Sequence, residues 1–480
     1  MEETQVIIVG GGVSGLAAAK VLSNKINFVL IEAQNYLGGR ISTIDAGSNL
    51  FLDMGAQYVV GNKSKLYKIC KDLHMLLNDK GINDETMVIT TDGRTFDSEW
   101  NDKAEDFWER SIDDVDEKFR GGKVKHPVSF ADFVPQQFRQ RLLSSSRFPR
   151  DLIEPIVHCF INSEMIDSAC SLSNLNLLEY NGYGDPPGEY ENELKNGGYR
   201  PFINYLRSFI PDEKQIRLNC EVQRVKYMER ERKLLVEMVD LRTEEKKFML
   251  CDQIIWTTSL GFLKENFQRI FASERLLIEQ KQNAIDQIGF GILNKVVIIY
   301  KERFWPNNIN YMKLLHTQPY RLDDLSPQLR AELHSQQVGQ HLIEEIANSL
   351  HFYGGLSSTH IPILTCWFAD SLAIKIENLN EQTLGQICHE VLCRYLRLDQ
   401  NQYKPIKVFR SQWFNNKYIR GSYSYQALNS TKQHRRELKT PYAPDGVPRI
   451  FFAGEATHED SYGIVNAAYE TGVEVAKKLL

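Results

Sequence analysis

The chain has 480 residues, which at about 100–200 residues per domain predicts two or three domains or one elaborated core. Its composition, 42% hydrophobic and 25% charged, excludes a disordered or collagen-like chain. The formal net charge of −5 argues against nucleic-acid binding, which requires a basic excess or patch.

The sequence also indicates the cellular location of the protein and the redox state of its cysteines. Strand-like sequence begins at Gln5, which leaves no room for a signal peptide, and no stretch approaches the ~18 apolar residues of a membrane span. The last three residues do not match the peroxisomal Ser-Lys-Leu signal. The eight cysteines include no Cys-x-x-Cys and predict reduced core thiols. We therefore expect a cytoplasmic protein that binds no membrane and no metal.

The predicted elements begin as strand, helix, strand. Val6–Val9 is an apolar run typical of a parallel strand buried on both faces, residues 14–23 predict a helix, and Phe28–Ile31 predicts a second buried strand. Residues from about 104 to 160 have apolar side chains at helical spacing. Further strands are expected at 216–225, 234–239, 248–250, 254–257, 293–300, 363–368 and 450–453, and further helices at 379–396 and 465–479.

A glycine motif connects the first strand to the first helix. Gly10, Gly12 and Gly15 form G-x-G-x-x-G, in which the first glycine permits a tight turn, the second lets the backbone approach a pyrophosphate and the third allows close packing of helix on strand. Ser14 lies at the start of the helix, whose free N–H groups favour phosphates. Glu32 ends the next strand, where its carboxylate can accept hydrogen bonds from ribose hydroxyls. This arrangement predicts a dinucleotide site, and the acid disfavours NADP.

Later segments decide between NAD and FAD. The chain resembles the flavin-containing amine oxidases, and within them the polyamine oxidase and spermine oxidase branch. The supporting segments follow one another in the order found in that family, at Val6–Glu32, Gly38–Thr43, Leu52–Gly61, Cys251–Lys264, Asn294–Val296, Trp413–Tyr425 and Phe451–Gly472. The resemblance implies FAD as the cofactor, an amine as the substrate and O2 as the electron acceptor.

The resemblance also implies roles for single residues. Arg40 would reach the FAD pyrophosphate, and Glu455 would bind the ribityl or pyrophosphate part. Lys295 is the predicted catalytic residue, because the family's lysine at this position holds a water against flavin N5. From the residues alone, Lys295 either projects to solvent or is desolvated between its apolar neighbours, and solvent is the commoner outcome. The remaining cofactor contacts are expected at Gly39, Gly55, Ala56, Val222, Trp413, Tyr418, Ile464 and Val465.

The substrate side departs from the family more than the cofactor side does. Substrate contacts are expected at Tyr58, Val60, Tyr183, Tyr423 and Ile464. Many polyamine oxidases have a His or Glu at the position of Val60, and Gly182 stands where mammalian acetylpolyamine oxidases place an acid. Ile464 replaces a second aromatic wall. Ser422 occupies the position of the flavin-linking cysteine of monoamine oxidases, so FAD is expected to bind non-covalently.

The predicted fold is α/β, with a Rossmann-type FAD-binding domain assembled from separated segments and an α+β substrate-binding domain. The FAD-binding domain is expected at residues 1–75, 196–285 and 405–480, and the substrate-binding domain at 76–195 and 286–404. The oligomeric state is not predicted.

The preferred function is oxidation of a polyamine or an N-acetylated polyamine, giving an aldehyde, a smaller amine and H2O2. An oxidase of another amine class, such as monoamines, and a flavin protein that has lost turnover remain alternatives. A flavin disulfide reductase would need a redox cysteine pair soon after the glycine motif, and there is none. A chromatin lysine demethylase would carry an extra helical module before Gln5 and a long coiled-coil insertion.

Overall fold

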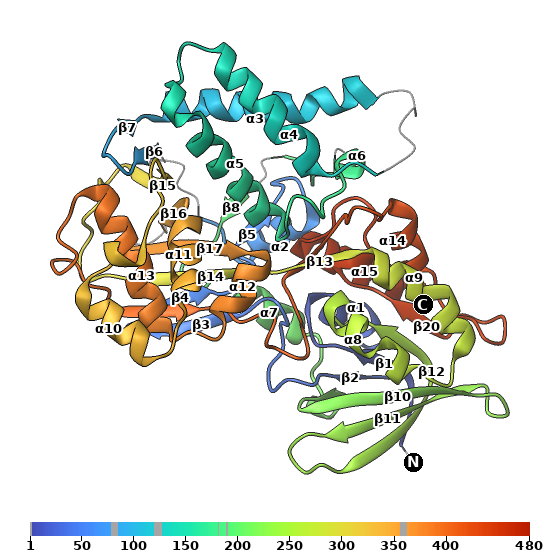
Figure 1. Ribbon diagram of the computed structural model, residues 1–480. Helices are drawn as coiled ribbons and strands as arrows, with labels where there is room; N and C mark the ends of the chain where they lie inside the picture. The colour runs from blue at the N-terminus through green and yellow to red at the C-terminus, as the bar shows by residue number, and fades with distance from the viewer. Residues whose placement is uncertain (1, 78–84, 120–126, 181, 189–190, 356–361) are drawn as a thin grey trace. The chain divides into compact units, whose positions relative to one another are not determined.

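The computed structural model describes residues 2–77, 85–119, 127–180, 182–188, 191–355 and 362–480. The chain forms two compact units, each assembled from separated segments (Figure 1). Unit 1 comprises Met1–Leu77, Gly182–Phe290 and Asn416–Leu480, and unit 2 comprises Asn78–Asn181 and Gly291–Asn415. None of the helices in the described ranges combines the length and the apolar character needed to cross a bilayer.

A seven-stranded sheet with a parallel centre organises unit 1. The apolar strand β1 (Glu2–Val9) lies between β2 (Phe28–Ile31) and β12 (Lys246–Trp256) and pairs in parallel with both. β9 (Ile216–Arg217) extends the parallel set beyond β2, and β20 (Ile450–Phe452) extends it beyond β12. The parallel centre follows the continuous apolar runs that the sequence displays, as expected of strands covered on both faces.

An antiparallel pair completes this sheet. β10 (Cys220–Met228) and β11 (Lys233–Asp240) form a hairpin that lies against the N-terminal half of β12 (Figure 1). β12 is one strand where the sequence predicted two, because β11 pairs with its first half and β20 with its second half. The single strand predicted at 216–225 is instead divided into β9 and β10, since Asn219 between them has a left-handed φ of 53°.

Helices and short strands surround the sheet of unit 1. α1 (Val13–Leu22) and α15 (Val465–Lys477) pack so closely that a Cβ on Gly472 would lie 2.1 Å from the Ser14 carbonyl oxygen. The other helices are α2 (Lys65–Asp72), α7 (Arg200–Arg207), η2 (Glu213–Gln215), α8 (Leu260–Ile270), α9 (Arg275–Gln287), α14 (Lys432–Lys439) and η4 (Glu455–Thr457). The short strands are β3 (Thr43–Gly47), β4 (Leu50–Asp53), β5 (Tyr58–Val60), β8 (Glu191–Glu193), β13 (Gly289–Gly291) and β19 (Tyr423–Tyr425).

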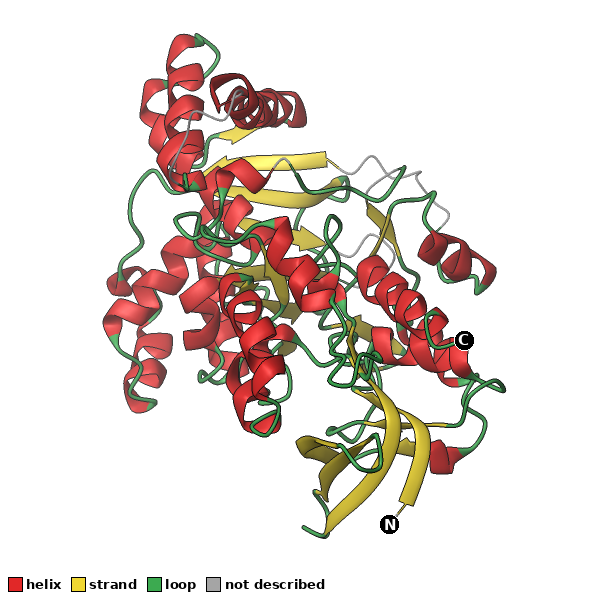
Figure 2. Cartoon of the chain, turned by 90° about the vertical axis from the view of Figure 1, so that its right-hand side faces the viewer, coloured by secondary structure: helices red, strands yellow, loops and turns green. Residues whose placement is uncertain are grey.

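Unit 2 is an α+β unit with a second seven-stranded sheet. In sheet order its strands are β18 (Lys407–Arg410), β14 (Leu293–Ile299), β17 (Ile363–Ala369), β16 (Phe352–Gly355), β15 (Ile309–Leu315), β6 (Glu85–Thr90) and β7 (Thr95–Phe96). Its helices, red in Figure 2, are α3 (Ser98–Phe119), α4 (Phe130–Ser144), η1 (Arg150–Leu152), α5 (Ile153–Ser168), α6 (Leu177–Tyr180), η3 (Leu322–Asp324), α10 (Pro327–Ser335), α11 (Gln340–Ser349), α12 (Asp370–Ile376) and α13 (Glu381–Leu396). The region predicted to be helical corresponds to α3–α5, with residues 120–126 outside the described residues.

The bounds of the units differ from the sequence expectation by more than ten residues at two places. The second segment of unit 1 begins at Gly182 and not near residue 196, because β8 pairs with β5 of the same unit. Its last segment begins at Asn416 and not near residue 405, because β18 pairs with β14 of unit 2. Trp413, expected in the FAD-binding domain, therefore lies in unit 2.

Candidate active site

The glycine turn of unit 1 has the geometry that a backbone site for phosphate needs. Gly10 has a φ of 106°, and a Cβ there would lie 2.7 Å from the Thr257 hydroxyl. A Cβ on Gly15 would lie 2.0 Å from the Gly10 carbonyl oxygen, so the helix can pack here only with glycine. A Cβ on Gly12 would meet only one atom, the Gly38 carbonyl oxygen at 4.0 Å. The turn therefore has room at Gly12 and none at its other two motif glycines.

A buried hydroxyl lies beside this turn. The Ser14 side chain is buried, and among the described residues its Oγ has no hydrogen-bond partner. An unpaired buried hydroxyl is costly unless something not present here completes it. Because Ser14 lies in the first turn of α1, where backbone N–H groups are also unpaired, an anionic phosphate oxygen fits both requirements.

Glu32 follows β2 and faces the glycine turn. Its Oε2 accepts a hydrogen bond from the Gly11 N–H at 2.6 Å, and its Oε1 accepts one from the Gln34 N–H at 2.8 Å. Burial raises the pKa of this carboxyl, and the backbone hydrogen bonds only partly oppose that effect. Each carboxylate oxygen still has a lone pair for a further donor. A pair of ribose hydroxyls suits this remaining capacity.

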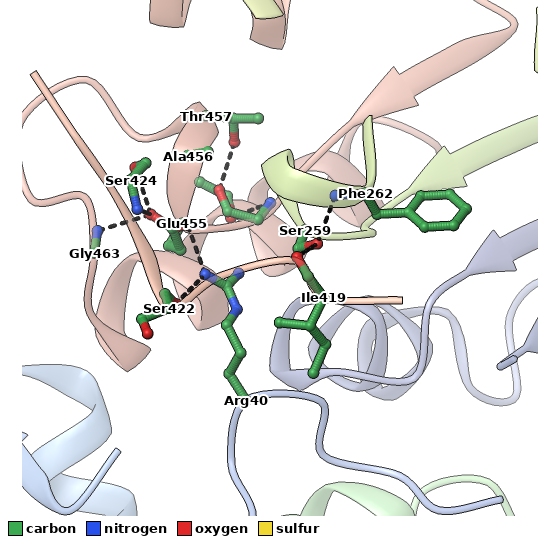
Figure 3. Close-up of polar contacts among 12 residues, drawn as sticks. Arg40, Ser259, Phe262, Ile419, Ser422, Ser424, Glu455, Ala456, Thr457 and Gly463 are labelled. Carbon is green, nitrogen blue, oxygen red and sulfur yellow. Dashed lines mark hydrogen bonds and ion pairs between the residues drawn. The ribbon is translucent and has the colours of Figure 1, made fainter. Parts of the chain in front are cut away.

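Arg40 and Glu455 form an ion pair in this region. Arg40 Nη1 donates to Glu455 Oε1 at 2.8 Å and to the Ser422 carbonyl oxygen at 2.9 Å (Figure 3). Glu455 Oε2 accepts from the Ser424 hydroxyl at 2.6 Å and from the Gly463 N–H at 2.9 Å. Burial would raise the pKa of Glu455, but the charge and hydrogen bonds of Arg40 and the Ser424 hydrogen bond together lower it. Glu455 therefore ties the loop of Arg40 to the segments around residues 422–424 and 463.

Arg435 is a member of this site that the sequence reasoning missed. It is fully buried, and its Nη1 donates to the Ser424 hydroxyl at 2.9 Å and to the Ala456 carbonyl oxygen at 3.0 Å. Its guanidinium carbon lies 3.6 Å from the centre of the Tyr462 ring. Burial lowers the pKa of Arg435 to about 10. A polar helix with Arg435 and Arg436 in tandem gave no sign in the sequence that only one of them is buried.

Other predicted cofactor residues lie in the same unit. Gly39 passes close to the glycine turn, since a Cβ on it would lie 3.4 Å from the Gly12 Cα. The Ala56 N–H donates to the Arg40 carbonyl oxygen at 3.4 Å, which brings Gly55 and Ala56 beside the Arg40 loop. Ile464 caps α15 at its N-terminus and Val465 is the first residue of that helix.

A second group gathers beside Glu32. The Cys220 N–H at the start of β10 donates to the Glu32 carbonyl oxygen at 3.0 Å, which places the strand of Val222 next to β2. The Tyr418 hydroxyl donates to Glu221 Oε2 at 3.2 Å. Because Val222 follows Glu221 in β10, Tyr418 lies beside the strand of Val222 although 196 positions in the numbering separate the two residues.

The predicted substrate residues of unit 1 lie on short strands and loops. On β5, Tyr58 is paired with Glu193 and Val60 with Glu191 of β8, and such directly opposed side chains share one face. The Tyr183 hydroxyl donates to the Tyr462 carbonyl oxygen at 3.1 Å. Tyr423 begins β19, and a Cβ on Gly463 would lie 3.6 Å from its ring.

Two predicted residues belong to unit 2. Lys295 lies within β14, and the residue is 7% exposed. It is therefore desolvated, which is the rarer of the two outcomes considered from its neighbours. Trp413 is equally buried, at 7%. Their roles toward a cofactor remain predictions.

Comparison with known proteins decides the family. A family model described as flavin containing amine oxidoreductase matches residues 13–480. The chain belongs to this family. The human peroxisomal N(1)-acetyl-spermine/spermidine oxidase is 25% identical to this amine oxidase, over 99% of this chain and 94% of its own length. Polyamine oxidase 1 of Oryza sativa subsp. japonica is 25% identical, over 100% of this chain and 97% of its own.

A solved structure shows the same fold. A redesigned putrescine oxidase superposes on the amine oxidase with a TM-score of 0.69 and 17% identity, over 100% of this chain and 99% of that one. The prediction of an α/β flavin amine oxidase fold is confirmed, and FAD is the cofactor. The residues of unit 1 fit that cofactor, because the unpaired Ser14 hydroxyl and the open face at Gly12 suit a phosphate, and Glu32 suits a ribose.

Proposed function

We propose that this enzyme oxidises an N-acetylated polyamine or a short polyamine, with O2 as the acceptor, to an aldehyde, a smaller amine and H2O2. The observation that supports the substrate class is similarity over nearly the whole chain to enzymes named for polyamines and their acetyl derivatives. FAD, when bound, accepts the electrons that leave the substrate's carbon–nitrogen unit. The protein's task is then to hold the cofactor, to position the amine and to exclude water.

The cofactor-facing residues have distinct proposed tasks. Glu32 accepts the ribose hydroxyls, the Ser14 hydroxyl and the first turn of α1 hold the pyrophosphate, and Arg40 supports that charge from the other side of the turn. Of the Arg40 donors, Nη1 is used by Ser422 and Glu455, and among the described residues Nη2 and Nε have no acceptor. Lys295 is proposed as the catalytic residue that holds a water at flavin N5. Non-covalent attachment is proposed from Ser422, and release of the flavin by acid precipitation tests it.

The substrate preference is proposed from missing charges. Val60 and Gly182 offer no charged group to a distal ammonium, and a buried ammonium without a partner is costly. Acetylation removes one such charge, so we expect a higher kcat/KM for N-acetylspermine than for spermine.

A second candidate, spermine itself, is favoured by one observation. Glu191 and Glu193 lie directly across the β5–β8 pair from Val60 and Tyr58. If these carboxylates bind the distal ammonium, spermine becomes the better substrate. Glu193→Gln would then raise KM for spermine more than KM for N-acetylspermine.

One assay tests the proposal against its alternatives. Peroxide release is measured with spermine, spermidine, their acetyl derivatives and aromatic monoamines, together with anaerobic bleaching of the bound flavin. Activity confined to monoamines would contradict the polyamine proposal, and absence of bleaching with every amine would indicate lost turnover. The cytoplasmic location also remains a proposal, which cell fractionation tests, since the human relative is named as peroxisomal.

A further inference from the structure

We propose that Glu377 is a positioning residue, which fixes the backbone of both Lys295 and Trp413 through one buried hydrogen-bond network. This inference rests on the proposed function, because it gives the two residues a common support for acting on the cofactor. All members of the network belong to unit 2. None of the supporting residues, Ser411, Asn294 and Glu377, was predicted as a site residue.

The network begins where β18 ends beside β14. The Ser411 N–H donates to the Lys295 carbonyl oxygen at 3.0 Å, as the next step of the strand ladder would. The second hydrogen bond of this pair does not follow the strand ladder. The Lys295 N–H donates at 2.8 Å to the Ser411 hydroxyl and not to a backbone carbonyl. The two backbone groups of Lys295 are thus bonded to one serine at the point where the chain leaves the sheet toward Trp413.

Ser411 is in turn held by a buried amide. Its hydroxyl donates to Asn294 Oδ1 at 2.8 Å, and the Asn294 side chain is completely buried. Asn294 Nδ2 donates to Glu377 Oε1 at 2.7 Å and to the Ala373 carbonyl oxygen at 3.0 Å. The orientation of the Ser411 hydroxyl, and with it the Lys295 backbone, is therefore set from the end of α12.

Glu377 also holds the chain on the far side of Trp413. Its Oε1 accepts from the Phe414 N–H at 2.9 Å, and its Oε2 accepts from the Asn415 N–H at 2.7 Å. Trp413 is consequently flanked by Ser411 on one side and by two amides bound to one carboxylate on the other. Displacement of Glu377 would move both flanks.

The charge of Glu377 makes this support specific. Glu377 is 2% exposed, and within the described residues its carboxylate forms no ion pair, so its direct contacts are N–H groups, while the charge of Arg410 interacts with it only at longer range. All the donors converge on two acceptor oxygens, which glutamine cannot supply because its amide nitrogen only donates. A buried carboxylate without a directly bonded cation is a costly way to stabilise a loop. Its use here is therefore explained by the precise placement it gives to the two flanking segments.

The test uses the holoenzyme and the variants Glu377→Gln and Ser411→Ala, with Glu345→Gln as the matched control. Glu345 pairs with Lys375 of α12 at a partly exposed position, so its loss removes a carboxylate near the same helix without touching the network. In both network variants we expect faster amide hydrogen exchange in the peptides around residues 293–299 and 411–415, at unchanged FAD content. Flavin reduction by substrate should slow roughly 10–100-fold, as expected of a small misplacement. The control should match wild type.

A double-mutant cycle with Lys295→Met separates positioning from general damage. If Glu377 acts through Lys295, Glu377→Gln should add less than about twofold to the slowing already caused by Lys295→Met. The inference is overturned if the two effects multiply, or if exchange around 293–299 and 411–415 is unchanged in both network variants. Wild-type flavin reduction in Lys295→Met alone would instead refute the proposed role of Lys295, while the exchange data still decide whether Glu377 fixes the two segments.

Discussion

Two buried carboxylates of unit 1 have opposite environments. Glu32, beside the glycine turn, receives backbone N–H groups and the Gln34 side chain, and burial raises its pKa. Glu455, on η4, receives Arg40 and the Ser424 hydroxyl, and its pKa is lowered despite complete burial. Unit 1 therefore contains one buried glutamate whose charge the protein compensates, Glu455, and one whose charge it compensates only in part, Glu32.

The difference separates a structural anion from a ligand-binding one. Glu455 joins three chain segments and has its partners in place, so its main contribution is to the fold around the cofactor. Glu32 has acceptor capacity left for further donors, and the ribose hydroxyls of FAD are the donors that we propose. The comparison predicts that loss of Glu455 mainly reduces stability, whereas loss of Glu32 mainly reduces FAD affinity.

The largest effect is expected for Glu455→Ala. Removing one partner of a buried ion pair leaves Arg40 uncompensated and the buried Arg435 without its neighbouring anion, a change that commonly costs about 3–5 kcal/mol. Urea unfolding of the protein stripped of FAD measures this loss. Glu459→Ala, which breaks an exposed pair with Arg436, is the control and should cost less than about 1 kcal/mol. Equal stability of the two variants would remove the structural role of Glu455.

A smaller effect, in a different quantity, is expected for Glu32→Ala. Two charge-assisted hydrogen bonds to ribose would be lost, each worth about 1.5–3 kcal/mol, so the Kd for FAD should rise at least tenfold. Titration of the stripped protein with FAD measures it. A Kd equal to that of wild type would contradict the ribose assignment and would make Glu32 a purely structural anion.

The smallest effect is on the pH dependence of stability, which should have opposite signs for Glu32 and Glu455. A raised pKa in the folded state means that the contribution of Glu32 to stability is present at low pH and is lost as pH rises through that pKa. The lowered pKa of Glu455 means that its contribution is present above its ordinary value of 4.5 and is lost as pH falls. We therefore compare the free energy of unfolding of the stripped wild-type protein with that of each glutamine variant. As pH rises, the wild type should gain stability relative to Glu455→Gln and lose stability relative to Glu32→Gln. Slopes of the same sign would show that the two environments do not differ as described.

The sequence predicted the parts of the fold that depend on local pattern. Strands at Val6–Val9 and Phe28–Ile31 could be predicted because strands buried on both faces are continuously apolar. Gly10 and Gly15 could be predicted from their motif, and in the structure their neighbours exclude any Cβ. The sequence predicted separate strands at 248–250 and 254–257, and only the two different partners, β11 and β20, explain why β12 is a single strand.

The parts of the site that depend on distant contacts could not be predicted. Arg435 resembles its exposed neighbour Arg436 in sequence, and its burial depends on Ser424 and Ala456. The role proposed for Glu377 depends on contacts to Asn294 and Phe414. Lys295 was recognised through family resemblance, since its apolar neighbours alone favoured exposure to solvent.

The order of strands in unit 1 has a consequence for how the chain reaches its folded state. β1 is made first, but its partner β12 follows more than half-way through the chain, and β20 and α15 come at its end. Closing such long loops reduces the entropy of the chain before the new contacts stabilise it, so topologies of this kind fold slowly. During synthesis the apolar β1 can pair early with β2 but not with β12, which leaves one strand edge exposed to other chains. We therefore expect nascent chains that stop before residue 450 to depend on chaperones, and the glycine turn to become able to retain FAD only after the last helix leaves the ribosome.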